Sequence, residues 1–298
     1  MTWQPTRIGD LSGRTAIVTG ANSGIGRVQA QELAAHGAHV VLAVRDIEAG
    51  RRAADEMAGS TEVAHLDLAS QASIRDFAGR IDGPVDLLVN NAGVMSPPHY
   101  RETVDGHEVQ WGTNHLGHFA LTALLLPNLL AAPDPRVTTV SSIAHRGGDE
   151  RVLEGNPRQG YDPTRSYSQS KLANLLFALE LHHRAVAAGS ALTSTAAHPG
   201  LSRTNLVASR DGMGARWFVR SLVPPLMRVV ASGPAGGAAP ILFAATEASP
   251  GSYTGPRGFR ELRGGVGPAR LSPHASDPDL ARRLWERSVE LTGLDVTF

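Results

Sequence analysis

The stretch TAIVTGANSGIG, residues 15–26, combines a short apolar run, a glycine-rich turn and the start of an amphipathic pattern. The run Thr15–Thr19 is typical of a buried strand. Gly20, Gly24 and Gly26 allow a tight turn, a close approach of the backbone to a ligand and close packing of the following helix. The free N–H groups at the start of that helix would attract a pyrophosphate. Because the spacing is Gly-x-x-x-Gly-x-Gly and not the commoner Gly-x-Gly-x-x-Gly, the turn alone is weak support for a dinucleotide site.

The rest of the chain repeats this alternation of short apolar runs and longer amphipathic patterns. Further strands are expected at residues 39–44, 63–66, 85–89, 137–140 and 192–197. Helices are expected at residues 26–36, 46–57, 70–80, 106–130 (kinked or ended near Pro127) and 166–188. Alternating strands and helices predict an α/β fold with a doubly wound parallel sheet. We expect one domain over residues 1–298, with a core at about 13–200 and a substrate lid and C-terminal segment appended at about 201–298.

Composition excludes several classes of protein. The 298 residues include 28 basic and 28 acidic side chains and no cysteine. Balanced charge argues against nucleic-acid binding, and the lack of cysteine excludes a disulfide scaffold, a thiolate nucleophile and Cys-based zinc sites. Residues 1–13 lack a secretory pattern, and the longest apolar stretch, 119–132, is too short to span a bilayer. We therefore expect a cytoplasmic protein.

The ends of the next strands predict how a dinucleotide would be held. If Val44 ends the second strand at the position of the ribose-binding carboxylate, Arg45 lies beside a 2′-phosphate and favours NADP; a shift by one residue brings Asp46 there and favours NAD. The first register is preferred. Asp67 and Leu68, after the third strand, are expected to contact the adenine. The fourth strand ends in residues 90–93, Asn-Asn-Ala-Gly, where amides can tie strands together and the glycine lets a cofactor approach.

Lys171 is the single lysine of the chain, and it lies four residues after Tyr167. On a helix, residues four apart share a face. The ammonium would stabilise a phenolate and so lower the pKa of Tyr167, which is too high in a free tyrosine for proton transfer at neutral pH. A compact ammonium can also hydrogen-bond a cofactor ribose. The pair therefore predicts a proton-transferring tyrosine.

Together these motifs resemble the short-chain dehydrogenase/reductase family, which has a Rossmann fold: Thr-Gly-x-x-x-Gly-x-Gly at 19–26, Asn-Asn-Ala-Gly at 90–93 and Tyr-x-x-x-Lys at 167–171. The resemblance implies that Ser142 and Asn114 join Tyr167 and Lys171 as catalytic residues. It also implies that Pro199, Gly200 and Thr204 contact the cofactor. The expected cofactor contacts are Gly20, Asn22, Ser23, Gly24, Ile25, Gly26, Arg45, Asp67, Leu68, Asn91, Ala92, Gly93, Tyr167, Lys171, Pro199, Gly200 and Thr204.

Residues 42–46, 114–119 and 170–174 are similar to the retinol dehydrogenase-like branch, which includes WW-domain oxidoreductases and protochlorophyllide reductases. The missing cysteine counts against the last of these. The resemblance implies NADP-dependent hydride transfer between the nicotinamide and a carbonyl or alcohol of a small lipophilic molecule. Tyr167 would transfer the proton, Ser142 would hydrogen-bond the substrate oxygen, and Asn114 would support a proton relay through water.

Some alternatives stay open. A non-catalytic, redox-sensing dinucleotide-binding protein could use the same fold. The basic, apolar segment 203–228 is interpreted as a lid with Trp217, Phe218 and Met227 on the substrate side, but a helix lying on a membrane surface has the same composition. No metal site is expected from the His and Glu spacing. Helices 106–130 and 166–188 are long enough for a homodimer interface, and a monomer is also compatible with the sequence.

Overall fold

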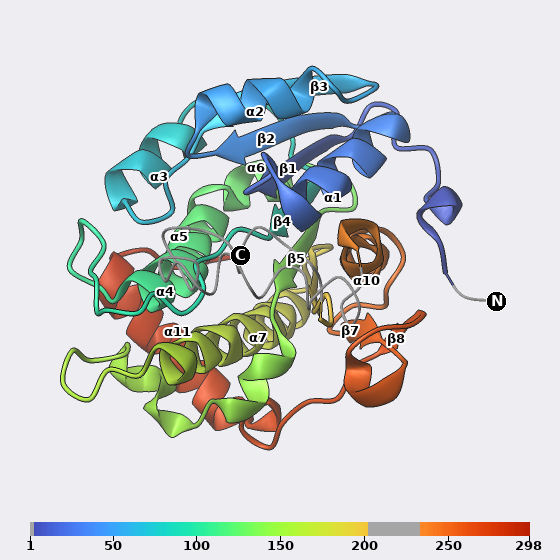
Figure 1. The fold of residues 1–298 in the computed structure, drawn as a ribbon. Helices are drawn as coiled ribbons and strands as arrows, with labels where there is room; N and C mark the ends of the chain where they lie inside the picture. Colours follow the sequence, from blue (N-terminus) through green and yellow to red (C-terminus); the bar gives the residue numbers. More distant parts are fainter. Residues whose placement is uncertain (1–2, 202–232) are drawn as a thin grey trace.

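The computed structural model of the protein describes residues 3–201 and 233–298 (Figure 1). One sheet of eight strands has the order β3-β2-β1-β4-β5-β6-β7-β8. The strands are β1 (Thr15–Thr19), β2 (His39–Val44), β3 (Ser60–His65), β4 (Leu87–Asn90), β5 (Arg136–Val140), β6 (Thr193–Ala197), β7 (Tyr253–Pro256) and β8 (Val266–Pro268). Neighbours from β3 to β7 are parallel, whereas β8 is antiparallel to β7. The expected α/β class and doubly wound sheet are confirmed.

Helices cover both faces of the sheet (Figure 1). They are α1 (Gly24–Ala35), α2 (Ile47–Ala54), α3 (Gln71–Ala78), α4 (Val109–Trp111), α5 (Gly117–Leu124), α6 (Leu126–Leu130), α7 (Pro163–Ala187), α10 (Pro234–Thr246) and α11 (Pro278–Thr292). Side chains of β1 alternate between two cores. Ala16 and Val18 pack with α1 and α10, whereas Ile17 packs with α3, α5 and α7. Such a sandwich buries both faces of the central parallel strands, which explains why β1, β2 and β4 are largely apolar on both faces.

Short helical turns lie in the connections between these helices and strands. They are the 3₁₀ turns η1 (Pro5–Arg7), η3 (Ile143–Gly147), η4 (Glu150–Glu154), η6 (Phe259–Glu261) and η7 (His274–Ser276), and the π turn η2 (Gly112–Leu116). The helix expected at 106–130 is thus divided into α4, η2, α5 and α6, with a break at Leu125 just before the turn that holds Pro127. The expected break near Pro127 is confirmed.

We expected residues 201–298 to be appended to the sheet. For two parts of the described segment after residue 232, the strands β7 and β8 and the helix α10, this expectation is wrong. Strands β7 and β8 extend the sheet beyond β6, and α10 packs against α1 and the strands beneath it. The sequence did not predict these elements, because both strands are short and contain glycine and proline, and because α10 contains Pro240. At the opposite edge, β3 begins three residues earlier than expected, since an edge strand with half-exposed polar side chains lacks an apolar run.

Among the helices in residues 3–201 and 233–298, none has both the length and the apolar character required to cross a bilayer.

Candidate active site

The turn between β1 and α1 has the close packing that its glycines predict. Gly20 has a φ of 67°, and a Cβ added there would lie 3.1 Å from Ala92. A Cβ added to Gly26 would lie 2.5 Å from the carbonyl oxygen of Gly20, so the first turn of α1 rests directly on the strand exit. Ser23 is the N-cap of α1, yet its side chain accepts no capping hydrogen bond. The first N–H groups of the helix are therefore available to an anion.

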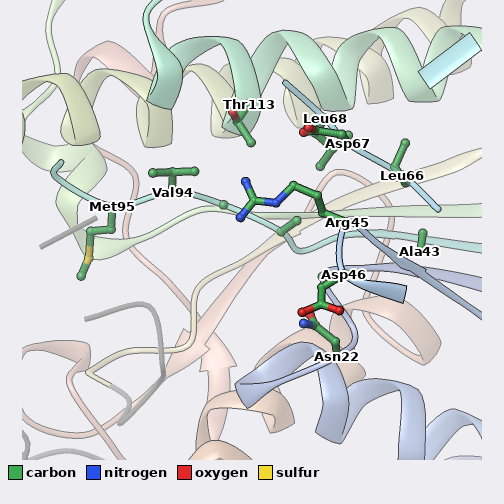
Figure 2. Close-up of a pocket in the computed structure, with 13 residues that line it drawn as sticks. Asn22, Ala43, Arg45, Asp46, Leu66, Asp67, Leu68, Val94, Met95 and Thr113 are labelled. Carbon is green, nitrogen blue, oxygen red and sulfur yellow. The ribbon is translucent and has the colours of Figure 1, made fainter. Parts of the chain in front are cut away.

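A cavity of about 180 Å³ opens at the carboxyl ends of β1 to β4 (Figure 2). This is where the chain connections on either side of β1 diverge, which is the usual ligand site of a doubly wound sheet. Seven of the expected cofactor residues line it: Gly20, Asn22, Arg45, Asp67, Leu68, Ala92 and Gly93. Asp46, which the alternative register had placed at the ribose, also lines it, as do five residues that were not expected: Ala43, Leu66, Val94, Met95 and Thr113.

Arg45 and Asp46, which follow β2, both line the cavity. Val44 is the last residue of β2, and Asp46 is the N-cap of α2, where its Oδ1 accepts a hydrogen bond of 2.9 Å from the N–H of Ala49. Arg45 extends its guanidinium into the cavity (Figure 2). Arg27, a second arginine close in sequence to the turn, instead pairs with Glu56.

Asn91 ties the exits of β1 and β4 together, as expected for the asparagine pair. Its Nδ2 donates to the carbonyl oxygen of Thr19 at 2.8 Å, and its Oδ1 accepts from Gln29 at 3.3 Å. The N–H groups of Asn91 and Ala92 both donate to Oγ1 of Thr19 at 2.9 Å. Asn91 itself does not line the cavity; it holds the two strand exits together, and the next residues, Ala92 and Gly93, line the cavity.

Helix α7 places Tyr167 and Lys171 one turn apart, beside Ser142. The Nζ of Lys171 lies 5.8 Å from the centre of the Tyr167 ring and donates to the carbonyl oxygen of Val140 at 3.1 Å. The Tyr167 side chain hydrogen-bonds to Ser142. A Cβ added to Gly93 would lie 3.6 Å from Nζ of Lys171. The wall of the cavity is therefore continuous with the group of Ser142, Tyr167 and Lys171.

Burial dominates the protonation of these two side chains. It raises the pKa of Tyr167 to about 12, and the hydrogen bond to Ser142 acts in the opposite direction. Burial also lowers the pKa of Lys171 to about 8, so the ammonium is still the main form at neutral pH. The sequence led us to expect a lowered pKa at Tyr167. In the protein alone the net shift is upward, because desolvation penalises the phenolate.

Asn114 lies in the π turn η2 and is fully buried. Its Oδ1 accepts from the N–H of Val94 at 2.7 Å, and its Nδ2 donates to the carbonyl oxygen of Val94 at 2.9 Å and to Oγ of Ser170 at 3.0 Å. The side chain therefore joins the wall of the cavity to α7. A part for Asn114 in a proton relay stays a prediction.

The remaining expected residues lie elsewhere or outside the described residues. Ser23, Gly24, Ile25 and Gly26 are at the start of α1. Pro199 and Gly200 follow β6 and do not line the cavity; the turn is held to the β7–β8 connection by a hydrogen bond of 2.8 Å from the N–H of Leu201 to the carbonyl oxygen of Leu262. Thr204, Trp217, Phe218, Met227 and the segment 203–228 lie outside the described residues.

Histidines form no metal site in the part of the chain that the structure describes, where no three His, Asp or Glu side chains gather as ligands. His115 and His118 are buried instead. The Nε2 of His115 lies 2.8 Å from Oγ of Ser288, and that of His118 lies 2.9 Å from Oγ1 of Thr19.

The unexpected lining residues carry only a weak signal in the sequence. Val94 and Met95 directly follow Gly93, and Thr113 directly precedes Asn114. Each therefore adjoins a motif, but only the folded chain shows that its side chain lies at the cavity.

Comparison with known proteins gives concordant matches. A family model described as short chain dehydrogenase matches residues 14–213. Retinol dehydrogenase 13 of Homo sapiens is 40% identical over 295 residues, which cover 96% of this chain and 86% of that protein. The crystal structure of an uncharacterised protein from Mycobacterium paratuberculosis covers all of both chains with 44% identity and a TM-score of 0.84. A structure titled as a NAD(P)-dependent gluconate 5-dehydrogenase from Beutenbergia cavernae, with NADP bound at low occupancy, has 27% identity and a TM-score of 0.60 over 82% of this chain and 95% of that one.

Proposed function

Since the chain belongs to the short-chain dehydrogenase family and is an oxidoreductase acting on alcohol or carbonyl groups, we propose that it transfers a hydride between NADP and a lipophilic alcohol or carbonyl compound. One observation carries this proposal. Gly93 is one of the residues that line the cavity at the glycine-rich turn; a Cβ added to it would lie 3.6 Å from Nζ of Lys171, which in turn lies 5.8 Å from the centre of the Tyr167 ring. A dinucleotide bound along the cavity would therefore present its reactive end to a tyrosine able to move a proton.

The residues present fit a nicotinamide dinucleotide. The uncapped start of α1 and the turn at Gly20 suit a pyrophosphate, and the cavity continues from there past Arg45 to Asp67 and Leu68. When bound, the nicotinamide supplies or accepts the hydride. The chain's own groups bind and orient the cofactor and handle the proton.

Our preference for NADP over NAD rests on Arg45 and Asp46. Both residues line the cavity; one carboxylate oxygen of Asp46 caps α2, and the guanidinium of Arg45 extends into the cavity (Figure 2). A guanidinium favours a 2′-phosphate, and a carboxylate would favour a free 2′-hydroxyl. The NADP in the structure from Beutenbergia cavernae is in keeping with this preference.

The chemical step would use three side chains. In carbonyl reduction the hydroxyl of Tyr167 donates its proton to the substrate oxygen as negative charge develops there, and in alcohol oxidation it accepts that proton. Ser142, which hydrogen-bonds to Tyr167, would also bind the substrate oxygen. The ammonium of Lys171 stabilises the phenolate form and so partly offsets the effect of burial.

The substrate class is inferred from relatives. Retinol dehydrogenase 13 is named for a lipophilic alcohol, and it matches this chain over 96% of its length. We therefore propose a lipophilic alcohol or aldehyde as the substrate. We also propose a single domain and a cytoplasmic location. A homodimer is proposed through α7 and the segment 106–130, which the structure divides into α4, η2, α5 and α6; within the chain, α3 packs on α5 and α11 packs on α7.

The test is a panel of lipophilic aldehydes and alcohols, including all-trans-retinal and all-trans-retinol, assayed with NADP(H) and NAD(H) side by side. We expect turnover that is faster with the phosphorylated cofactor. Turnover preferring NAD(H) would contradict the cofactor assignment. Tight NADPH binding with no turnover on any member of the panel would favour the redox-sensing alternative.

A further inference from the structure

Two consecutive residues of η6, in the connection between β7 and β8, have an unusual backbone conformation. Arg260 has a φ of 51° and Glu261 a φ of 59°, both in the left-handed region. This region is unfavourable for such residues, because their Cβ crowds the following carbonyl oxygen. Strain of this kind persists only where the surrounding structure holds it, and it often accompanies a functional contact. The guanidinium of Arg260 lies over the exposed ring of Phe259, whereas the side chain of Glu261 is only 12% exposed.

The carboxylate of Glu261 contacts three other segments of the chain. Its Oε2 accepts a hydrogen bond of 2.6 Å from the guanidinium of Arg146, in η3. The same oxygen lies 3.3 Å from Nε2 of His198, the residue that follows β6. Its Oε1 accepts a hydrogen bond of 3.2 Å from the N–H of Arg270. The left-handed backbone thus directs one carboxylate inward, to a point where three segments meet.

The ring of His198 does not compete with Arg146 for the charge of Glu261. His198 is fully buried, and burial lowers its pKa, so the ring is neutral at neutral pH. Its Nδ1 accepts a hydrogen bond of 3.1 Å from the N–H of Gly200, so the proton of the neutral ring is on Nε2, the atom that faces the carboxylate. A Cβ added to Gly255 of β7 would lie 2.0 Å from Nε2, so only glycine leaves room for the ring. The negative charge of Glu261 is therefore balanced by Arg146.

The segment that carries Arg146 begins at Ser142, the residue proposed to bind the substrate oxygen. Ser142 is the N-cap of η3 and caps it through Oγ. His145 is fully buried; its Nδ1 donates to the carbonyl oxygen of Ser142 at 2.7 Å, and its Nε2 accepts from the N–H of Ser272 at 3.3 Å. His145 thus joins η3 to Ser142, and the next residue, Arg146, joins it to Glu261. A displacement of η3 would therefore move Ser142.

We infer that Glu261 is a positioning residue: by holding Arg146, it fixes η3 and so keeps the hydroxyl of Ser142 where it can bind the substrate oxygen. The carboxylate acts through Arg146 and takes no part in proton or hydride transfer. This inference rests on the proposed function, which gives Ser142 its contact with the substrate.

The test compares wild type with Glu261→Gln, which keeps the shape of the side chain and removes its charge, and with Arg146→Met, which removes the other half of the ion pair. The rate of NADPH oxidation on the most active carbonyl compound of the panel is measured in a single turnover, with enzyme in excess, so that product release does not limit it. Misplacing a catalytic group by about 1 Å can cost about 100-fold in rate, so we expect each variant to react about 10–100-fold more slowly. Each should bind NADPH, measured by calorimetry, as tightly as wild type. The double variant should be no slower than the slower single variant, because both changes break the same contact.

Glu290 offers a matched control. Its carboxylate accepts a hydrogen bond of 2.6 Å from Arg287 on α11, the same length as the bond between Arg146 and Glu261, but its side chain is 67% exposed. Exposed ion pairs contribute little, so Glu290→Gln should change neither the rate nor the dissociation constant. Ser142→Ala is the reference for loss of the serine itself and should be at least as slow as Glu261→Gln. Thermal unfolding of each variant shows whether it folds.

The failure of the proposed function can be distinguished from the failure of the inference. If wild type oxidises NADPH on no member of the panel, or if Ser142→Ala reacts as fast as wild type, the proposed function or the role of Ser142 fails, and the inference fails with it. If Ser142→Ala is slow but Glu261→Gln and Arg146→Met react at the wild-type rate, the inference is wrong while the proposed function stands.

Two further results would overturn the inference. If Glu261→Gln binds NADPH more weakly but reacts at the wild-type rate once saturated, Glu261 acts through the turn at Pro199 and Gly200 and not through Ser142. If the double variant slows by the product of the two single effects, Glu261 and Arg146 act separately. If Glu261→Gln does not fold, Arg146→Met decides the question by the same criteria, since it leaves the carboxylate bound to the N–H of Arg270.

Discussion

The charge of Lys171 can be removed with little damage to the packing around it. In Lys171→Met the ammonium disappears, while the carbonyl oxygen of Val140 still accepts a hydrogen bond of 3.0 Å from Nδ2 of Asn174. Nζ of Lys171 lies 5.8 Å from the centre of the Tyr167 ring. With an effective dielectric constant of about 20, a unit charge at this distance stabilises the phenolate by about 3 kcal/mol, or about 2 pKa units. The substitution should therefore raise the pKa of Tyr167 by about 2 units.

The assay is the pH dependence of kcat/KM for alcohol oxidation with NADP⁺, using an active alcohol from the panel. Below the Lys171 pKa of about 8, where wild type keeps the ammonium, the rising limb should move about 2 pH units upward and the rate should fall about 100-fold. Arg184→Met is the control, because its guanidinium lies 4.4 Å from the Trp285 ring, outside the site. A rising limb that does not move in Lys171→Met, or that moves equally in the control, would refute the electrostatic reasoning.

Three further predictions concern cofactor choice, acid stability and packing. Arg45→Gln should weaken NADPH binding, measured by calorimetry, by about 1.5–3 kcal/mol and leave NADH binding nearly unchanged. The control Arg27→Gln, which breaks the ion pair of Arg27 with Glu56, should affect neither cofactor. Equal losses for both cofactors in Arg45→Gln would contradict the assignment of Arg45. Burial lowers the pKa of His115 to about 3 and that of His118 to about 4, so both rings stay neutral in the folded protein. As the pH falls below the unfolded pKa of about 6.5, the unfolded chain takes up protons that the folded chain does not, and the free energy of unfolding should fall by about 1.4 kcal/mol per pH unit for each ring. Urea unfolding that gives the same free energy at about pH 5 and at about pH 7, on either side of that pKa, would disprove this. Gly117→Ala should lower the free energy of unfolding by about 1–3 kcal/mol, because its Cβ would lie 2.4 Å from a backbone carbonyl oxygen; a variant as stable as wild type in thermal unfolding would show that the helix can shift.

The sequence was most informative where chemistry restricts the choice of residue. A tight strand-to-helix turn needs Gly20 and Gly26, and the structure uses both as expected. The single lysine marked Lys171, which does lie beside Tyr167. These positions could be predicted because few side chains can replace them.

Other features depend on tertiary contacts that local sequence does not encode. Strand β7 is a four-residue segment containing glycine and proline, and it becomes a strand through its pairing with β6 and β8. The side chain of Thr113 is an ordinary helical threonine until the fold brings it to the cavity. The net upward shift in the pKa of Tyr167 likewise follows from burial, which the spacing of Tyr and Lys did not reveal.

The central claim is that Tyr167 moves the proton in a hydride-transfer reaction, and Tyr167→Phe tests it most directly. The measurement pairs the dissociation constant for NADPH with the rate of NADPH oxidation on the most active carbonyl compound of the panel. The account predicts that the variant binds NADPH as wild type does and oxidises it no faster than the cofactor is lost without substrate. A variant that binds NADPH normally and still reduces the carbonyl compound at the wild-type rate would contradict it.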